Sequence, residues 1–480
     1  MSVRRSLAWT YIAQIICFAI SFGSTVVIAR LVSPRDFGIF AMAGAATTII
    51  NVLMQFGLAK YIMREGVVSR DFLRPVFTVN VFMTFIYVGS ILIGSIASKQ
   101  MFGSVEVGQF LFIFAFFPVF AMFEFIPAAL AAREMRFGLA ATMAVLRAVV
   151  MASTTIILAL RGFGFMSFAW AQVLSWVATS VCYNLAIWRP DVWKPSFAGI
   201  REIIRFGWQM IGISGVSQLA ARGGDMVLGS FLGLASLGLY NRASSLPAQL
   251  YGSIYGAGTN VLFSQLSKEL RETDSIHKSY LRFMRLILAA LWPVLCGLAI
   301  LSSPIIDLLY GAKWQAAALP LALLSISYGI TLAIGMSAEV FILRHRTQQQ
   351  FRIESIRALV GFLLFCGGSA ISLTLAAAAK VAEAVFAFLL YRKPMIELVG
   401  GPDGALRQIY VEAVMVATAA VLPALLLMIW SAWSPATPLL HLAIAVLAGV
   451  ICWAALLIRL RHPLYLECAR LLQLKALAKA

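Results

Sequence analysis

Six charged side chains lie inside long apolar stretches of the chain: Glu124, Arg147, Arg222, Asp225, Lys380 and Glu383. A charge at the centre of a bilayer costs at least about 2.5–3.5 kcal/mol, so an intramembrane charge usually serves a function. Arginine and lysine bind anionic groups, and a carboxylate either holds such a cation or binds a coupling proton or Na⁺. The three cations are therefore candidate substrate-binding residues, and the three acids are candidates for ion coupling or for pairing.

Two of the acid–base pairs could be purely structural. Arg222 stands three residues before Asp225, and Lys380 stands three residues before Glu383. Side chains at this spacing meet on one face of a helix, so each pair could simply make its charges tolerable inside a membrane. The sequence leaves a functional role and a structural role open for all four residues.

The third pair is predicted from depth in the membrane. Glu124 and Arg147 lie on the two arms of an expected helical hairpin whose turn is near Met135. A helix rises about 1.5 Å per residue, so the two charges stand at nearly equal depth on adjoining helices. Because an unpaired buried charge is costly, we expect them to form an ion pair. The pair is either a gate, which an arriving anion opens by competing for Arg147, or a fixed brace of the hairpin.

The elements that carry these charges must be membrane-spanning helices. Of the 480 residues, 61% are hydrophobic and only 12% are charged, whereas a soluble domain has about 25% charged residues. A spanning helix needs about 20 mostly apolar residues. The sequence predicts an all-α, polytopic membrane protein with about fourteen such helices, at 7–29, 38–58, 75–97, 108–131, 139–160, 165–187, 206–228, 240–264, 284–303, 317–343, 355–372, 373–390, 408–431 and 438–458.

The basic residues predict the orientation of these helices. The net charge is +18, and the predicted cytoplasmic segments hold most of the 38 Lys and Arg residues. The opposite side holds only Arg30, Arg35, Lys99, Arg161, Arg242 and Lys313. By the positive-inside rule, both termini are cytoplasmic. Because the bases stand singly between apolar stretches, they do not indicate nucleic-acid binding.

The residues that usually hold metals or perform catalysis are scattered. None of the six cysteines stands close to another, and the four histidines are equally dispersed. We therefore expect no disulfide framework, no metal site, no catalytic triad and no cofactor, apart from a coupling H⁺ or Na⁺.

A faint internal repeat predicts the domain organisation. The exit of the first helix, Arg30 to Phe40, and that of the seventh, Phe231 to Tyr240, each place a glycine between apolar residues shortly before an aromatic one. Two helical lobes in the same orientation, with the substrate between them, are a common transporter architecture. We predict six-helix lobes at 1–198 and 199–395, related by a parallel pseudo-two-fold repeat. Two additional transmembrane helices and a cytoplasmic tail would follow at 396–480.

Four segments carry a resemblance to a known family: Ala29 to Phe40, Ile126 to Phe137, Asp225 to Ala243, and Leu309 to Trp314. In this order and spacing they resemble the polysaccharide transporter branch of the multidrug/oligosaccharidyl-lipid/polysaccharide (MOP) flippase superfamily. That branch comprises Wzx-type and exopolysaccharide-export flippases. With the helix number, the resemblance covers most of the chain.

The resemblance implies export of a polyprenyl-diphosphate-linked oligosaccharide across the bacterial inner membrane by alternating access, in exopolysaccharide or lipopolysaccharide biosynthesis. Its implied partners are the lipid-linked oligosaccharide, membrane lipids, and a polysaccharide polymerase with other export machinery. A diphosphate headgroup is anionic, which would explain the intramembrane cations Arg147, Arg222 and Lys380.

Two other functions are weighed against this one. A cation-coupled multidrug or metabolite exporter of the same superfamily would share the fold. A membrane polysaccharide polymerase or ligase would need a reactive polar site on a sizeable outer loop. The predicted outer loops are short and carry little charge, so we expect a transporter and not an enzyme.

Overall fold

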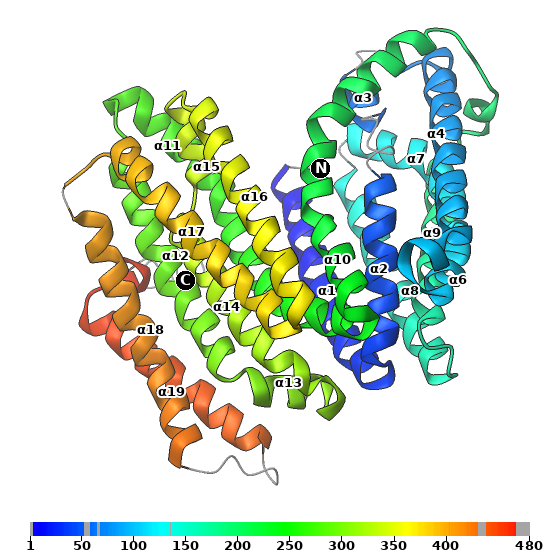
Figure 1. Cartoon of the computed structure of the whole chain (residues 1–480). Helices are drawn as coiled ribbons and strands as arrows, with labels where there is room; N and C mark the ends of the chain where they lie inside the picture. The colour runs from blue at the N-terminus through cyan, green and yellow to red at the C-terminus, as the bar shows by residue number, and fades with distance from the viewer. Residues whose placement is uncertain are drawn as a thin grey trace, which may run out of the picture. The chain divides into compact units, whose positions relative to one another are not determined.

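The computed structural model describes residues 3–51, 58–64, 68–134, 136–402, 404–430 and 438–466. All regular structure in these ranges is helical (Figure 1). Ten of the described helical segments are long and apolar enough to cross a membrane. The prediction of an all-α, multi-pass membrane fold is confirmed, and the number fourteen stays a prediction.

The helices form two compact units, Met1–Gly238 and Leu239–Ala480. The first unit contains α1 (Val3–Leu31), α2 (Pro34–Asn51), α3 (Leu58–Arg64), α4 (Arg70–Ile96), α5 (Ser98–Phe102), α6 (Val105–Phe114), α7 (Phe117–Arg133), α8 (Phe137–Leu160), α9 (Met166–Ala186), the 3-10 helix η1 (Pro190–Trp193) and most of α10 (Ile200–Leu250). Within this unit α8 packs along both α1 and α9, and α9 also packs along α7. The hairpin of α7 and α8 is thereby held together by α9.

The second unit begins within α10. It continues with the π-helix η2 (Tyr251–Tyr255), α11 (Gly256–Thr273), α12 (His277–Ile300), α13 (Ser302–Tyr310), the 3-10 helix η3 (Ala312–Ala317), α14 (Ala318–Leu332), α15 (Ser337–Leu343), α16 (Thr347–Ile371), α17 (Leu373–Val399), α18 (Ala405–Trp430) and α19 (Pro438–Arg459). The yellow helices α16 and α17 lie side by side (Figure 1), and α17 also packs on α14. The predicted lobes at 1–198 and 199–395 rest on the repeat and not on contacts, so their bounds stay a prediction.

The turn between α16 and α17 lies where the sequence predicts it, although no charge marks it. Ser372 has an extended backbone, and its hydroxyl accepts a hydrogen bond from the Leu375 amide at 3.1 Å. A serine in this position satisfies one of the free N–H groups that begin a helix.

The beginning of α16 differs from the prediction. The sequence places this helix at 355–372 and leaves Arg357 at the cytoplasmic side. The structure begins α16 at Thr347, so Arg357 lies well inside the helix. The many polar residues between Thr347 and Arg357 lower the local hydropathy, but they do not interrupt the helix.

The two repeated exits meet in a close helix crossing inside the first unit. A kink at Gly233, with φ of 82°, divides α10, so a new helix begins at Leu234, as α2 begins at Pro34. A Cβ atom on Gly38 would lie 1.6 Å from the carbonyl oxygen of Leu234. A Cβ atom on Gly238 would lie 1.9 Å from the carbonyl oxygen of Pro34. Each glycine therefore admits the first carbonyl of the other helix, a reciprocal contact that only residues without a side chain allow.

We expect Gly38→Ala and Gly238→Ala each to lower the melting temperature of the detergent-solubilised protein, because the new methyl group would force two backbones apart. Overpacking of this kind typically costs about 1–3 kcal/mol. Gly44→Ala on the same helix is the matched control, since its Cβ would meet nothing within 4 Å. A melting temperature for Gly38→Ala equal to that of the Gly44→Ala control would contradict the close crossing.

Candidate functional site

Glu124 and Arg147 form the ion pair that the hairpin argument predicts. Glu124 lies on α7 and Arg147 on α8, and Nη2 of Arg147 is 2.5 Å from Oε1 of Glu124. The Glu124 side chain is 7% exposed, whereas that of Arg147 is 32% exposed. The acid is thus enclosed, and the cation retains an open face.

Two residues of α9, which the sequence analysis missed, complete this cluster. The Thr179 hydroxyl is fully buried, donates to Oε2 of Glu124 at 2.6 Å and accepts from Arg147 at 3.0 Å. The guanidinium carbon of Arg147 lies 3.6 Å from the centroid of the Trp176 ring, a cation–π contact. Because α9 is separated in sequence from the hairpin, only the packing of the three helices reveals these partners.

The predicted pair of Lys380 and Glu383 lies in the second unit, on α17. Nζ of Lys380 is 2.8 Å from Oε2 of Glu383, as the spacing predicts. Arg357 of α16 also reaches this carboxylate, with Nη1 2.9 Å from Oε1 of Glu383. The side chain of Glu383 is 12% exposed, and that of Lys380 is 38% exposed. One carboxylate therefore faces two cations.

A second acid balances the charge of this cluster. Glu354 receives two hydrogen bonds from Arg357, from Nε at 3.0 Å and from Nη2 at 2.5 Å. The Tyr391 hydroxyl donates to the same carboxylate at 3.0 Å. A bidentate contact of this kind holds the guanidinium plane in one orientation. Neither Glu354 nor Arg357 is predicted as a site residue from the sequence, because hydropathy places this part of α16 on the cytoplasmic side.

The second cluster borders a polar cavity of about 230 Å³ within the second unit. Arg357, Lys380 and Glu383 line it, together with the polar side chains of Ser244, Ser327, Tyr328 and Thr331. The Ser327 hydroxyl donates to the backbone carbonyl of Lys380 at 2.8 Å, which ties α14 to α17 at this depth. The cavity presents two cations beside one carboxylate, and the two cations suit an anion.

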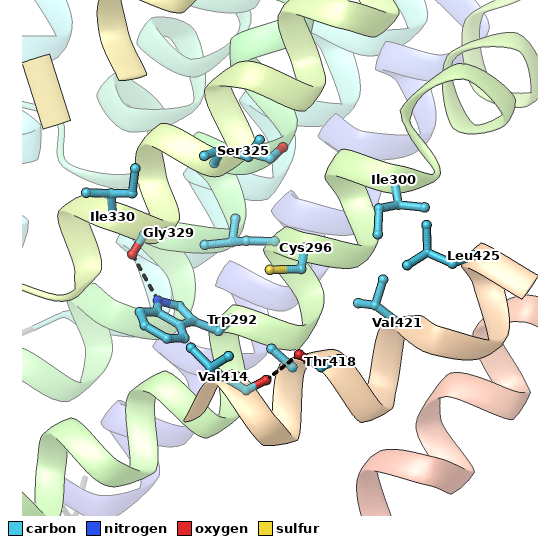
Figure 2. Close-up of a pocket in the computed structure, with 13 residues that line it drawn as sticks. Trp292, Cys296, Ile300, Ser325, Gly329, Ile330, Val414, Thr418, Val421 and Leu425 are labelled. Carbon is cyan, nitrogen blue, oxygen red and sulfur yellow. Dashed lines mark hydrogen bonds between the residues drawn. The ribbon is translucent and has the colours of Figure 1, made fainter. Parts of the chain in front are cut away.

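An apolar pocket of about 360 Å³ lies elsewhere in the second unit, between α12, α14 and α18 (Figure 2). Trp292 and Cys296 border it from α12, and Val414 and Val421 from α18. Its polar atoms are largely used internally: Nε1 of Trp292 donates to the carbonyl of Gly329 at 2.9 Å. The remaining surface is apolar and suits a hydrocarbon chain.

Of the predicted pair Arg222 and Asp225, the structure describes only the side chain of Asp225. Asp225 lies on α10 in the first unit and is partly buried. The side chain of Arg222 lies outside the described residues, so the pairing of these two stays a prediction.

Metal ligands do not gather in the part of the chain that the structure describes: it contains no group of three His, Cys, Asp or Glu side chains able to hold an ion. The coupling ion, H⁺ or Na⁺, is thus an open prediction.

The enclosed position of Glu124 leads to a thermodynamic prediction. Arg147→Gln should lower the melting temperature strongly, since removing one partner of a buried pair typically costs about 3–5 kcal/mol. Glu124→Gln should cost less, because the open face of Arg147 leaves the cation partly hydrated. The double variant Glu124→Gln/Arg147→Gln should recover much of the loss, and thermal denaturation in detergent measures all three. A double variant as unstable as Arg147→Gln alone would show that the pair does not carry the effect.

The chain is similar to proteins of polysaccharide export. Residues 27–319 match the family described as polysaccharide biosynthesis protein. The succinoglycan biosynthesis transport protein ExoT of Rhizobium meliloti is 23% identical over 333 residues, 68% of this chain and 67% of that protein. The lipopolysaccharide biosynthesis protein WzxC of Escherichia coli is 23% identical over 342 residues, which are 68% of this chain and 67% of that protein. The teichuronic acid biosynthesis protein TuaB of Bacillus subtilis is 24% identical over 299 residues, 61% of this chain and 62% of that protein.

Solved structures show the same fold. The lipid II flippase MurJ in an inward closed conformation superposes with a TM-score of 0.72 at 15% identity, covering 94% of this chain and 99% of that one. An inward-facing multidrug resistance MATE transporter of the MOP superfamily superposes with a TM-score of 0.58 at 16% identity, covering 79% and 94%. The resemblance stated from the sequence is thereby confirmed, and the chain belongs to the polysaccharide biosynthesis protein family, with the fold of MOP-superfamily transporters.

Proposed function

We propose that this protein translocates a polyprenyl-diphosphate-linked oligosaccharide across the bacterial inner membrane, by alternating access, during polysaccharide biosynthesis. Both termini are cytoplasmic in this proposal. The observation that carries it is the polar cavity in the second unit, where Lys380 and Arg357 stand at membrane depth with their cationic ends partly accessible.

The chemistry of the cavity matches a diphosphate better than a cation. Glu383 is 12% exposed, whereas Lys380 is 38% and Arg357 is 30% exposed, so an arriving ligand meets more of the cations than of the acid. A diphosphate would exchange the carboxylate contacts of these cations for its own oxygens. The hydroxyl groups of Ser244 and Thr331 also border the cavity, and they donate to the backbone carbonyls of Asn241 and Ser327.

The acids then gain a role in coupling. When a diphosphate engages Lys380 and Arg357, the carboxylate of Glu383 loses its partners in a poorly hydrated place. A proton or a Na⁺ ion would compensate this charge. The same exchange at Arg147 would release Glu124 in the first unit. In this scheme the ion pairs hold the cations while the protein is empty.

The apolar pocket between α12, α14 and α18 offers a place for the polyprenyl chain (Figure 2). Burial of hydrocarbon contributes about 0.8 kcal/mol per CH₂ group transferred from water. A chain that leaves the bilayer only to enter this pocket gains little of that energy. Its contribution would be to guide the lipid while the polar headgroup crosses.

The direct test is transport in proteoliposomes. The purified protein should move a fluorescent polyprenyl-diphosphate-linked oligosaccharide between leaflets, measured as the labelled sugar that becomes accessible to an added quencher. A cationic dye of the kind that multidrug exporters carry should not be transported under a proton or Na⁺ gradient. Transport of the dye without transport of the lipid-linked sugar would favour the drug exporter.

A charge-removal series tests the cavity. Lys380→Gln should slow transport by about tenfold or more, because a hydrogen bond to a charged group contributes about 1.5–3 kcal/mol. Lys380→Arg keeps the charge and should retain most of the rate. Lys99→Gln is the matched control, because that lysine is exposed outside the cavity. Equal rates for Lys380→Gln and Lys99→Gln, with the protein folded, would remove the cavity from the transport path.

A further inference from the structure

An aromatic pocket of about 400 Å³ lies at the end of α9 that the charge distribution assigns to the cytoplasmic side. Phe123 of α7, Trp188 just beyond α9, and Trp193 of η1 form its walls. The Trp193 ring stands edge-on to both of the others, with centroids 5.6 Å from Phe123 and 5.8 Å from Trp188. This pocket is separate from both charged clusters and has no part in the proposed transport path.

The wall formed by η1 is fixed in place by contacts with α4. Nε of Arg70 is 2.9 Å from Oδ2 of Asp191, the second residue of η1. Beyond η1, the Ser196 amide donates to the Thr78 hydroxyl at 2.9 Å. The pocket is therefore preformed, since the loop that closes it is anchored on both sides of Trp193.

The floor of the pocket carries two polar side chains, Asn184 and Ser180. Nδ2 of Asn184 donates to the carbonyl oxygens of Phe123 at 3.1 Å and Ser180 at 2.8 Å. Asn184 is 9% exposed and Ser180 is 5% exposed, and both line the pocket. An aromatic pocket of this size with a few polar groups is typical of a small-ligand site.

Positive charge adjoins the pocket. Arg189 directly follows Trp188, and Lys194 directly follows Trp193, and both basic side chains are exposed. Tryptophan is enriched at membrane–water interfaces, where its ring lies at headgroup level. Basic pockets at the ends of transmembrane helices on the cytoplasmic side bind anionic headgroups.

We propose that this pocket binds an anionic phospholipid of the inner leaflet. Its glycerol and ester groups lie beside Ser180, Trp188 and Trp193 flank them, and Arg189 and Lys194 hold the phosphate. The lipid ties η1 and α9 to the membrane surface beside α4. It is a resident lipid and not the transported substrate.

Native mass spectrometry of the full-length protein with added lipids tests the assignment. The wild-type protein should retain phosphatidylglycerol in preference to phosphatidylcholine. Arg189→Gln/Lys194→Gln should weaken phosphatidylglycerol binding by roughly thirtyfold at low salt, because each basic residue near a membrane surface contributes about 1 kcal/mol. Trp193→Ala should reduce the retention of both lipids, since it removes a wall of the pocket.

Two controls lie elsewhere in the same unit. Arg161→Gln removes an exposed charge, and Trp170→Ala removes an exposed tryptophan near the other end of α9. Both should bind phosphatidylglycerol like the wild type. Equal retention of the two lipids by the wild type, or an equal loss in Arg161→Gln, would overturn the proposal. Displacement of phosphatidylglycerol by equimolar polyprenyl diphosphate would also overturn it, because the pocket would then belong to the transported lipid.

Discussion

A charged group in a poorly hydrated interior must find a partner, and this requirement organises both units of the protein. Arg147 is held by Glu124, Lys380 by Glu383, and Arg285 of α12 by Glu412 of α18, with Nε 3.0 Å from Oε2. Except for Lys380 with Glu383, these pairs join two helices, so each also sets how the helices lie against one another. The apolar side chains around them contribute buried surface, but they do not fix how the helices lie against one another.

The two charged clusters solve this requirement differently. In the first unit, Thr179 and Trp176 occupy two sides of the Glu124–Arg147 pair, and the acid is almost fully enclosed. In the second unit, the corresponding acid Glu383 faces two cations beside a polar cavity. An anion could displace the carboxylate at Lys380 without opening a helix contact. At Arg147 it would have to disrupt a contact that spans three helices, which makes the first cluster the better brace and the second the better binding place.

Much of this arrangement could be predicted, for identifiable reasons. Hydropathy predicts the apolar helices, because a bilayer requires long apolar stretches. The Glu124–Arg147 pair is predicted because a short turn places these two residues at equal depth on adjoining helices. Arg357 could not be predicted as a site residue, because its polar neighbours lower the local hydropathy. Hydropathy alone therefore places the start of this helix too late in the sequence. Thr179 and Trp176 could not be predicted either, because their contacts with Glu124 and Arg147 depend on the packing of α9 against the hairpin. The repeated glycines were visible as a pattern, but their reciprocal contact at Pro34 and Leu234 appears only in three dimensions.

Arg242 connects two of the sequence segments that carry the family resemblance. The sequence predicts that it lies on the outer side of the membrane, where basic residues are few. In the structure it lies inside α10 with 3% of its surface exposed. Its guanidinium carbon lies 4.9 Å from the ring centroid of Tyr310 and 5.5 Å from that of Trp314. The third and fourth segments of the family resemblance, Asp225 to Ala243 and Leu309 to Trp314, therefore meet at one cation between two aromatic rings. A change in either segment would remove this cation–π contact from a buried arginine. Two segments far apart in the sequence thus share one packed contact, independently of any role in binding the substrate.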